Sequence, residues 1–229
     1  MRLMRKHGNL FGYSTTYHRF NTEVVGSVDF INQMQQEGCH FGWYFTYIPV
    51  GSDAQPGMVV TPEQRAFMFH RLRELRKKTP MFILDFWNDG EFVGGCIAGG
   101  RQYLHINARG DVEPCAFIHY SNVNIKNMSL QEALKQPLFE QYRINQPFNH
   151  NHLRPCPALD NPNKLREMIK ASNASSTQIN DFESVEEFTS KCEEHASGWA
   201  KVADELQKSR KMNGSEKKKL VIIEEEICV

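Results

Sequence analysis

Apolar residues follow two alternating patterns over the first ninety residues. The strings 10–17, 41–48 and 81–86 are rich in aromatic and β-branched residues, and the second and third are apolar almost throughout. Such runs are typical of strands in a parallel sheet that is covered on both faces. Between these strings, after Asn21 and after Thr61, apolar residues return every three or four positions, as on one face of a helix.

Local signals mark where the two helices begin and end. Gly38 follows the first periodic segment, so we expect a single helix from Asn21 to that glycine. Thr61, Pro62 and Gln64 supply a cap, a proline at the first helical position and a glutamine three residues after the cap. The second helix should therefore run to about Lys78. Strands alternating with helices predict an α/β fold with a parallel sheet and right-handed crossovers.

The pattern changes after residue 90, where glycines become frequent. Residues 103–107 and 112–115 predict an antiparallel hairpin that turns at Gly110. Ser129 and Glu132 form a capping signal for a helix that Pro137 should end or kink. After residue 172 we expect a polar linker and a final helix that begins at Ser184, with an apolar face. That face carries Val185, Phe188, Cys192, Trp199, Val202 and Leu206.

Composition and charge narrow the function classes. The chain of 229 residues is 40% hydrophobic, enough for a sizeable core, and its 27 basic residues balance its 27 acidic ones. This balance predicts neither nucleic-acid nor membrane binding, and the basic run 217–219 is expected to be a solvated tail. No signal peptide or long apolar segment is evident, so we expect a cytoplasmic protein whose six cysteines stay reduced.

Three of the cysteines have a spacing that favours metal binding. Cys96, Gly110 and Cys115 stand as C-x13-G-x4-C, and Cys156 lies between two prolines. Thiolates are the preferred ligands of iron-sulfur clusters and also bind zinc. A hairpin turning on glycine would bring Cys96 and Cys115 together. The alternative is that these thiols are ordinary core residues, which is how we interpret Cys39 and Cys192.

These residues resemble a known family. The C-x(9 to 15)-G-x4-C pattern opens the SPASM and twitch domains of radical S-adenosylmethionine enzymes. The stretch 11–51 looks like the fifth strand, fifth helix and sixth strand of their partial (βα)6 barrel. The strings DFWNDG, GCIAGGRQYLHINARGDVEPCAFIHYSN and LRPCPALDNP look like one subgroup of radical SAM proteins. The resemblance spans roughly residues 8–172 and implies an auxiliary [4Fe-4S] cluster at Cys96, Cys115 and Cys156, with zinc as the alternative metal.

The resemblance also implies a domain organisation. Residues 1–90 would be the C-terminal half of a partial barrel, residues 91–172 a SPASM/twitch-like cluster domain, and residues 173–229 a linker, an amphipathic helix and a charged tail. The C-x3-C-x2-C motif that binds the cluster which cleaves S-adenosylmethionine does not occur in this sequence. We therefore expect the back half of an enzyme, unable to cleave S-adenosylmethionine alone.

Two further expectations follow from the half-barrel interpretation. The adenine of S-adenosylmethionine would pack against Tyr47, Ile48 and Pro49 at a strand tip, if a companion supplied the other half. The first strand would be an open sheet edge, so we expect either a companion chain with the N-terminal half-barrel or self-association through that edge.

Other polar residues carry weaker signals. A fourth cluster ligand is not evident. The fourth iron could be open for substrate or could bind His119, His152 or Asp160, and Cys192 is a further candidate that lies on an apolar face. The sequence DFWNDG, with Asp85, Asn88 and Asp89, follows a predicted buried strand, where functional groups gather, although turn formation is the simpler account. We expect His105 and Asn107 to have cross-strand partners rather than a catalytic role.

Three functions remain open at this point. The first is a radical SAM enzyme fragment with an auxiliary iron-sulfur cluster. The second is a non-catalytic iron-sulfur or zinc binding module. The third is a degenerate domain without metal.

Overall fold

Three strands form a parallel sheet in the first part of the chain. The computed structural model describes residues 1–180 and 182–227, with side chains for 1–180 and 182–210. The strands β1 (Gly12–Tyr17), β2 (Phe41–Thr46) and β3 (Phe82–Asp85) lie in the order β1-β2-β3, and each pair is parallel. The α/β class and the parallel arrangement predicted from the sequence are confirmed.

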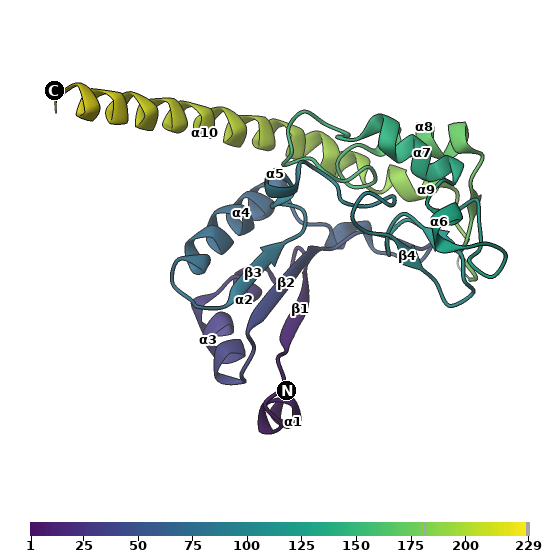
Figure 1. Ribbon diagram of the computed structural model, residues 1–229, viewed down its shortest axis with the longest axis horizontal. Helices are drawn as coiled ribbons and strands as arrows, with labels where there is room; N and C mark the ends of the chain where they lie inside the picture. Colours follow the sequence, from purple (N-terminus) through teal and green to yellow (C-terminus); the bar gives the residue numbers. More distant parts are fainter. Residues whose placement is uncertain (181, 228–229) are drawn as a thin grey trace.

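Helices cover one face of this sheet (Figure 1). They are α2 (Thr22–Val25), α3 (Val28–Gln36) and α4 (Pro62–Arg76), while the short α1 (Arg2–Lys6) precedes β1 and η1 (Pro56–Met58) precedes α4. Tyr13, Tyr17 and Tyr44 point from the sheet into a core shared with Met68 and Leu72. The capping box at Thr61 is formed as the sequence predicted.

The helix expected from Asn21 to Gly38 is interrupted. It ends at Val25 and begins again at Val28, and the Ser27 side chain caps the second piece by accepting a hydrogen bond from the Phe30 amide (3.0 Å). A Cβ at Gly26 would lie 3.1 Å from the Met68 sulfur, so the break lets α4 approach closely. Val24 and Val28 are therefore exposed. The three-to-four-residue spacing after Asn21 had placed both of them on the apolar face of one helix.

The opposite face of the sheet is partly open, which corrects the expectation that its strands are covered on both sides. Along β2, alternate residues are buried and accessible, and Trp43 is 39% exposed. Phe82 at the start of β3 is 63% exposed. The sequence could not show this, because an aromatic side chain on an open face gives the same apolar run as one on a covered face.

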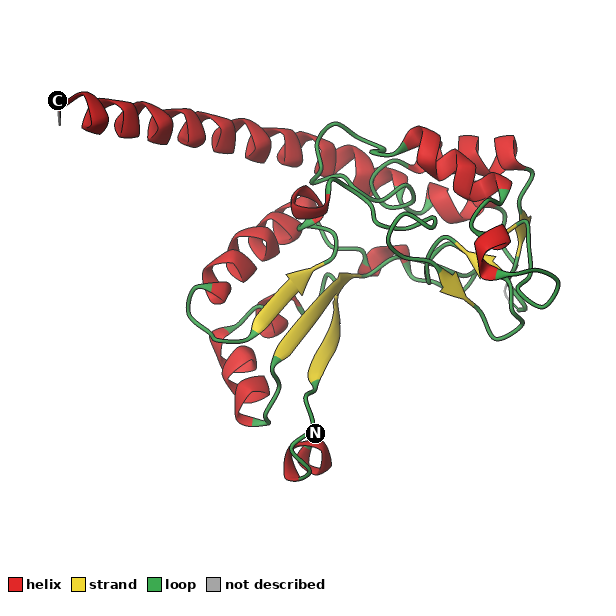
Figure 2. Ribbon diagram, in the orientation of Figure 1, coloured by secondary structure: helices red, strands yellow, loops and turns green. Residues whose placement is uncertain are grey.

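The second part of the chain is mainly loops and short elements (Figure 2). After α5 (Gly90–Val93), β4 (His105–Ile106) pairs antiparallel with β5 (Val112–Glu113), and Gly110 between them has a φ of 94°. The helices α6 (Leu130–Ala133), α7 (Pro137–Asn145) and α8 (Pro162–Ser172) follow. Pro137 is the first residue of α7, so it separates α6 from α7.

The residues that follow position 172 pack on this second part of the chain. They do not form the separate polar linker that we expected from the sequence. The strand β7 (Ser175–Ser176) pairs antiparallel with β6 (Tyr120–Ser121), and α9 (Val185–Ser190) packs against α8. The backbone of α10 then runs from Glu193 to Ile227. Cys228 lies outside the described residues. None of the described helices has the length and apolar character needed to cross a membrane.

A buried ion pair joins the two parts of the molecule. Arg65 on α4 and Asp160 in the loop before α8 are both fully buried and lie 2.5 Å apart. The Arg65 guanidinium also stacks over the Trp199 ring of α10, 4.3 Å from its centroid, and donates to the Leu153 carbonyl (3.1 Å). Through these contacts the sheet-covering helix is attached directly to the cysteine-bearing loops.

Candidate metal centre

Glycines and a hydrogen bond between distant segments of the chain place the Cys96 segment next to the Cys115 segment. Gly94 ends α5 in the left-handed region, with a φ of 71°, which turns the chain toward Cys96. Three residues further on, the Gly99 amide donates to the Pro114 carbonyl (3.1 Å). The segment 96–99 therefore lies directly against the residue before Cys115, although 19 positions separate the two cysteines in the sequence.

The third cysteine lies in a tightly bonded loop immediately before α8. The Cys156 amide donates to the Asp160 carboxylate (3.0 Å), and the Cys156 carbonyl accepts from the Asp160 amide (3.2 Å) and from the Asn161 side chain (3.0 Å). Asn161 also binds the Arg154 carbonyl (2.9 Å). These contacts hold the loop in one conformation, as the flanking prolines led us to expect.

The three thiols meet in one buried environment. All three pack against the same hydrophobic core, and all are free. Burial, and then the proximity of Cys156, raises the pKa of Cys96 to about 12. Burial, then Cys96 and Cys156, raises the pKa of Cys115 well above its usual value. The three cysteines selected from the sequence therefore lie around one hydrophobic core.

Backbone amides point at these sulfurs. The Ala98 amide donates to Cys96 Sγ and the Leu159 amide to Cys156 Sγ, each at 3.4 Å. Near Cys115, the Ile118 amide donates to the Cys115 carbonyl (3.2 Å). Burial alone would keep all three sulfurs protonated, so a cation is needed to hold them as thiolates, and the amides then stabilise the sulfur charge.

A fourth thiol lies in the same core. Cys192 follows α9 and is fully buried, and burial followed by the proximity of Cys156 raises its pKa. The apolar spacing of its helix concealed this position from the sequence reasoning, because a core thiol and a ligand thiol occupy the same kind of face. Cys39, in contrast, is buried in the separate core beneath the sheet.

Two of the other candidate ligands, Asp160 and His119, have protein partners. Asp160 uses its carboxylate on Arg65 and on the Cys156 amide. His119 Nδ1 lies 3.3 Å from the buried Glu113 carboxylate. His152 is half-buried, and its carbonyl lies against Gly90. His105 Nδ1 lies 2.7 Å from the opposing Glu113, so the cross-strand role expected for it is confirmed.

The sequence DFWNDG forms a buried polar network at the end of β3. Asp85 accepts from the Asn88 side chain (2.8 Å), and Arg65 Nε donates to that same side chain (3.2 Å). Asp89 accepts from the Asp85 amide (2.8 Å) and pairs with Arg76. Burial and then Asp89 raise the pKa of Asp85 to about 6. This network and the turn it fixes account for these residues without a ligand.

The strand tip assigned to adenine lies at the end of β2. Ile48 is buried in the core that also contains the cysteines, and the Tyr47 hydroxyl accepts a hydrogen bond from the Gln55 amide (3.2 Å). Pro49 is buried as well.

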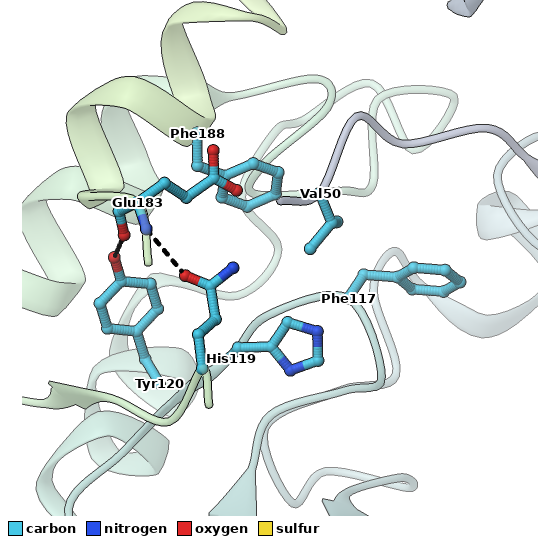
Figure 3. Close-up of a pocket in the computed structure, with 7 residues that line it drawn as sticks. Val50, Phe117, His119, Tyr120, Glu183 and Phe188 are labelled. Atoms are coloured by element: carbon cyan, nitrogen blue, oxygen red, sulfur yellow. Dashed lines mark hydrogen bonds between the residues drawn. The ribbon is translucent and has the colours of Figure 1, made fainter. Parts of the chain in front are cut away.

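A small cavity lies beside the cysteine core (Figure 3). Its volume of about 10 Å³ is enough for about one water molecule. Its lining includes Val50, Phe117, His119, Tyr120, Glu183 and Phe188. A cavity of this size does not hold an organic substrate.

Comparison with known proteins agrees with this geometry. Residues 96–159 match the family model of SPASM, an iron-sulfur cluster-binding domain. The matched range begins at Cys96 and contains Cys115 and Cys156, while Cys192 lies outside it. No curated protein and no solved structure matches the chain. This part of the chain is therefore similar to SPASM iron-sulfur cluster-binding domains.

Zinc is the alternative metal for these three thiols. Among the described residues, no group of three histidine, cysteine or acidic side chains could hold one metal ion. A zinc ion needs its thiolates converging on one point about 2.3 Å from each sulfur, whereas a multi-iron cluster is larger and spreads its ligands. The arrangement gives the zinc alternative no support.

Proposed function

We propose that this chain binds an auxiliary [4Fe-4S] cluster through Cys96, Cys115 and Cys156, with Cys192 as the fourth thiolate. The observation that supports the proposal is that three cysteines of the matched domain pack against one hydrophobic core, where backbone amides donate to the sulfurs of Cys96 and Cys156. Cys192 is included because it is fully buried in the same core and close enough to Cys156 to be affected by its charge.

The protein groups would each contribute to holding this cluster. A bound cluster supplies one-electron redox chemistry or a positive centre for binding a ligand. Amides of Ala98 and Leu159 stabilise the thiolate charge, and Asp160 fixes the loop that presents Cys156. Apolar side chains around the sulfurs exclude water.

We further propose that the domain belongs to a radical SAM system. Support comes from the residue patterns over 8–172 and from the SPASM match, because such domains typically carry auxiliary clusters in radical SAM enzymes. In that setting Tyr47, Ile48 and Pro49 would contact S-adenosylmethionine when a C-x3-C-x2-C motif is supplied in trans. A non-catalytic iron-sulfur module is the alternative, and activity with a companion chain distinguishes the two.

The test is anaerobic purification followed by iron and sulfide analysis of serine variants. We expect brown protein, and we expect Cys96→Ser, Cys115→Ser and Cys156→Ser each to lose most of the bound iron, because each change removes one of the three thiolates that lie within the matched domain. Cys192→Ser should retain a cluster with an altered electron paramagnetic resonance spectrum, because one iron then has a new ligand.

Cys39→Ser is the matched control. It changes a buried cysteine in the other core, so its iron content and spectrum should equal those of the wild type. Wild-type protein without iron or sulfide would overturn the proposal. An unchanged spectrum in Cys192→Ser would remove only the assignment of the fourth ligand.

A further inference from the structure

One buried hydroxyl in the cysteine core lacks a hydrogen-bond partner. The Tyr142 side chain on α7 is fully buried, and its hydroxyl bonds to no group among the described residues. Buried hydroxyls in native proteins are almost always paired, because leaving one unpaired costs free energy. A partner that is not part of the polypeptide is the simplest explanation for this exception.

The ring of Tyr142 lies where the first two cysteine segments meet. It packs on Gly99, and a Cβ at that position would overlap the ring. Gly99 is the residue whose amide bonds to Pro114, immediately before Cys115. At the end of the same helix, Gln146 donates to the carbonyls of Cys96 (3.2 Å) and Ala98 (3.0 Å).

These contacts leave the ring little freedom. Phe148 packs edge-on against it, with ring centroids 5.2 Å apart, so the hydroxyl is held in one direction. Burial raises the pKa of Tyr142 first, and the charges of Cys115, Cys96 and Cys156 raise it further. The ring therefore lies in the core against which all three cysteines pack, and its hydroxyl bonds to none of their sulfurs.

We propose that the Tyr142 hydroxyl donates a hydrogen bond to the bound cluster, at a bridging sulfide or a cysteinyl sulfur. This inference rests on the proposed function. In this role Tyr142 would contact the cluster directly and change its reduction potential. A donor stabilises the more negative, reduced cluster, so it raises the reduction potential.

Tyr142→Phe tests this proposal, because it removes one oxygen and keeps the packing of the ring. In the reconstituted protein titrated with dithionite, we expect full iron content and a more negative midpoint potential. A tenfold fall in the equilibrium constant for one-electron reduction corresponds to a shift of about 59 mV. The optical spectrum of the oxidised cluster should change little.

Tyr120→Phe is the matched control. Tyr120 is a buried tyrosine of the same core, but its hydroxyl donates to the Glu183 carbonyl (3.4 Å), and its raised pKa owes nothing to the cysteines. Its potential should equal that of the wild type. An equal potential in Tyr142→Phe, with the cluster present, would overturn the inference while leaving the proposed function intact.

A second measurement guards against a purely structural effect. In the protein stripped of iron, removing an unpaired buried hydroxyl should raise the melting temperature, whereas in the iron-loaded protein the same change should give a smaller gain or a loss. Equal changes in melting temperature in the two forms would mean that the hydroxyl does not bond to the bound cluster, and would also overturn the inference.

Discussion

At a single buried histidine, two contacts fix both the tautomer and the charge. His195 Nδ1 lies 2.9 Å from the Val60 carbonyl, and Nε2 lies 3.1 Å from Arg65 Nη1. Nδ1 must therefore carry the proton and Nε2 must accept from the guanidinium. A second proton would face that cation, so burial and then Arg65 lower the pKa of His195 to about 4.

This pKa makes stability depend on pH. Because the folded pKa lies below the unfolded value of about 6.5, the contribution is complete above pH 6.5 and is lost as the pH falls toward 4. The shift corresponds to about 3 kcal/mol. We expect His195→Gln to show a flatter decline of the unfolding free energy between pH 6.5 and 4 in urea titrations.

The comparison between variant and wild type isolates the contribution of His195 to the pH dependence of the unfolding free energy. Asp85, whose pKa is raised to about 6, works in the opposite direction over the same range, and it is present in both proteins. His70→Gln, a change at an exposed site on α4, should keep the wild-type slope. A wild-type slope in His195→Gln would contradict the assignment.

Individual ligands were predictable only where a motif carries them. Cys96, Cys115 and Cys156 stand out through glycine spacing and flanking prolines, and all three pack against one hydrophobic core. Cys192 and Tyr142 could not be found this way. Tyr142 lies on the buried face of α7 and Cys192 in the turn between α9 and α10, and only tertiary packing shows what lies beside each of them.

At the scale of elements, sequence signals located helix starts better than helix continuity. The capping boxes at Thr61, Ser129 and Ser184 are all formed, because a side chain and a backbone amide three residues away are enough to make them. The break at Gly26 and Ser27 depends instead on how closely α4 approaches. Such a contact leaves no trace in local periodicity.

The contact between α4 and the Cys156 loop should carry much of the stability of the molecule. Asp160→Asn leaves the Arg65 guanidinium buried without its counter-charge, and breaking a buried pair in this way costs about 3–5 kcal/mol. Chemical denaturation of the variant measures the loss. Glu167→Gln, which breaks an exposed pair with Lys164, should cost less than about 1 kcal/mol.

If Asp160→Asn were as stable as Glu167→Gln, the buried pair would not be what joins the two parts. Hydrophobic contacts such as that between α4 and α10 would then have to carry the attachment.

At the scale of the whole molecule, the sheet has features of an interface. The edge strand β1 is unpaired on one side among the described residues, and the accessible face next to it carries Phe41, Trp43 and Phe82. Open edges and apolar faces are usually covered in native proteins. We expect either a companion chain or a second copy of this chain to cover them.

Amide hydrogen exchange checks this expectation. In a dilute monomer, residues 10–50 should be the fastest-exchanging part of the chain, because their sheet has one open face and one open edge. Protection there should rise with concentration if copies associate, and Trp43→Lys should abolish that rise. Strong protection of 10–50 in the monomer would count against an incomplete barrel.

The double use of Asp160 has a consequence for how the molecule responds to iron. The Asp160 carboxylate contacts both the backbone amide of Cys156 and the guanidinium of Arg65 on α4. Ligands that bind only the folded chain stabilise everything that folds with them. Cluster binding at the cysteines would thus be thermodynamically linked to folding of the sheet. The stability of the sheet would then rise with iron binding, although the three cysteines lie outside the sheet.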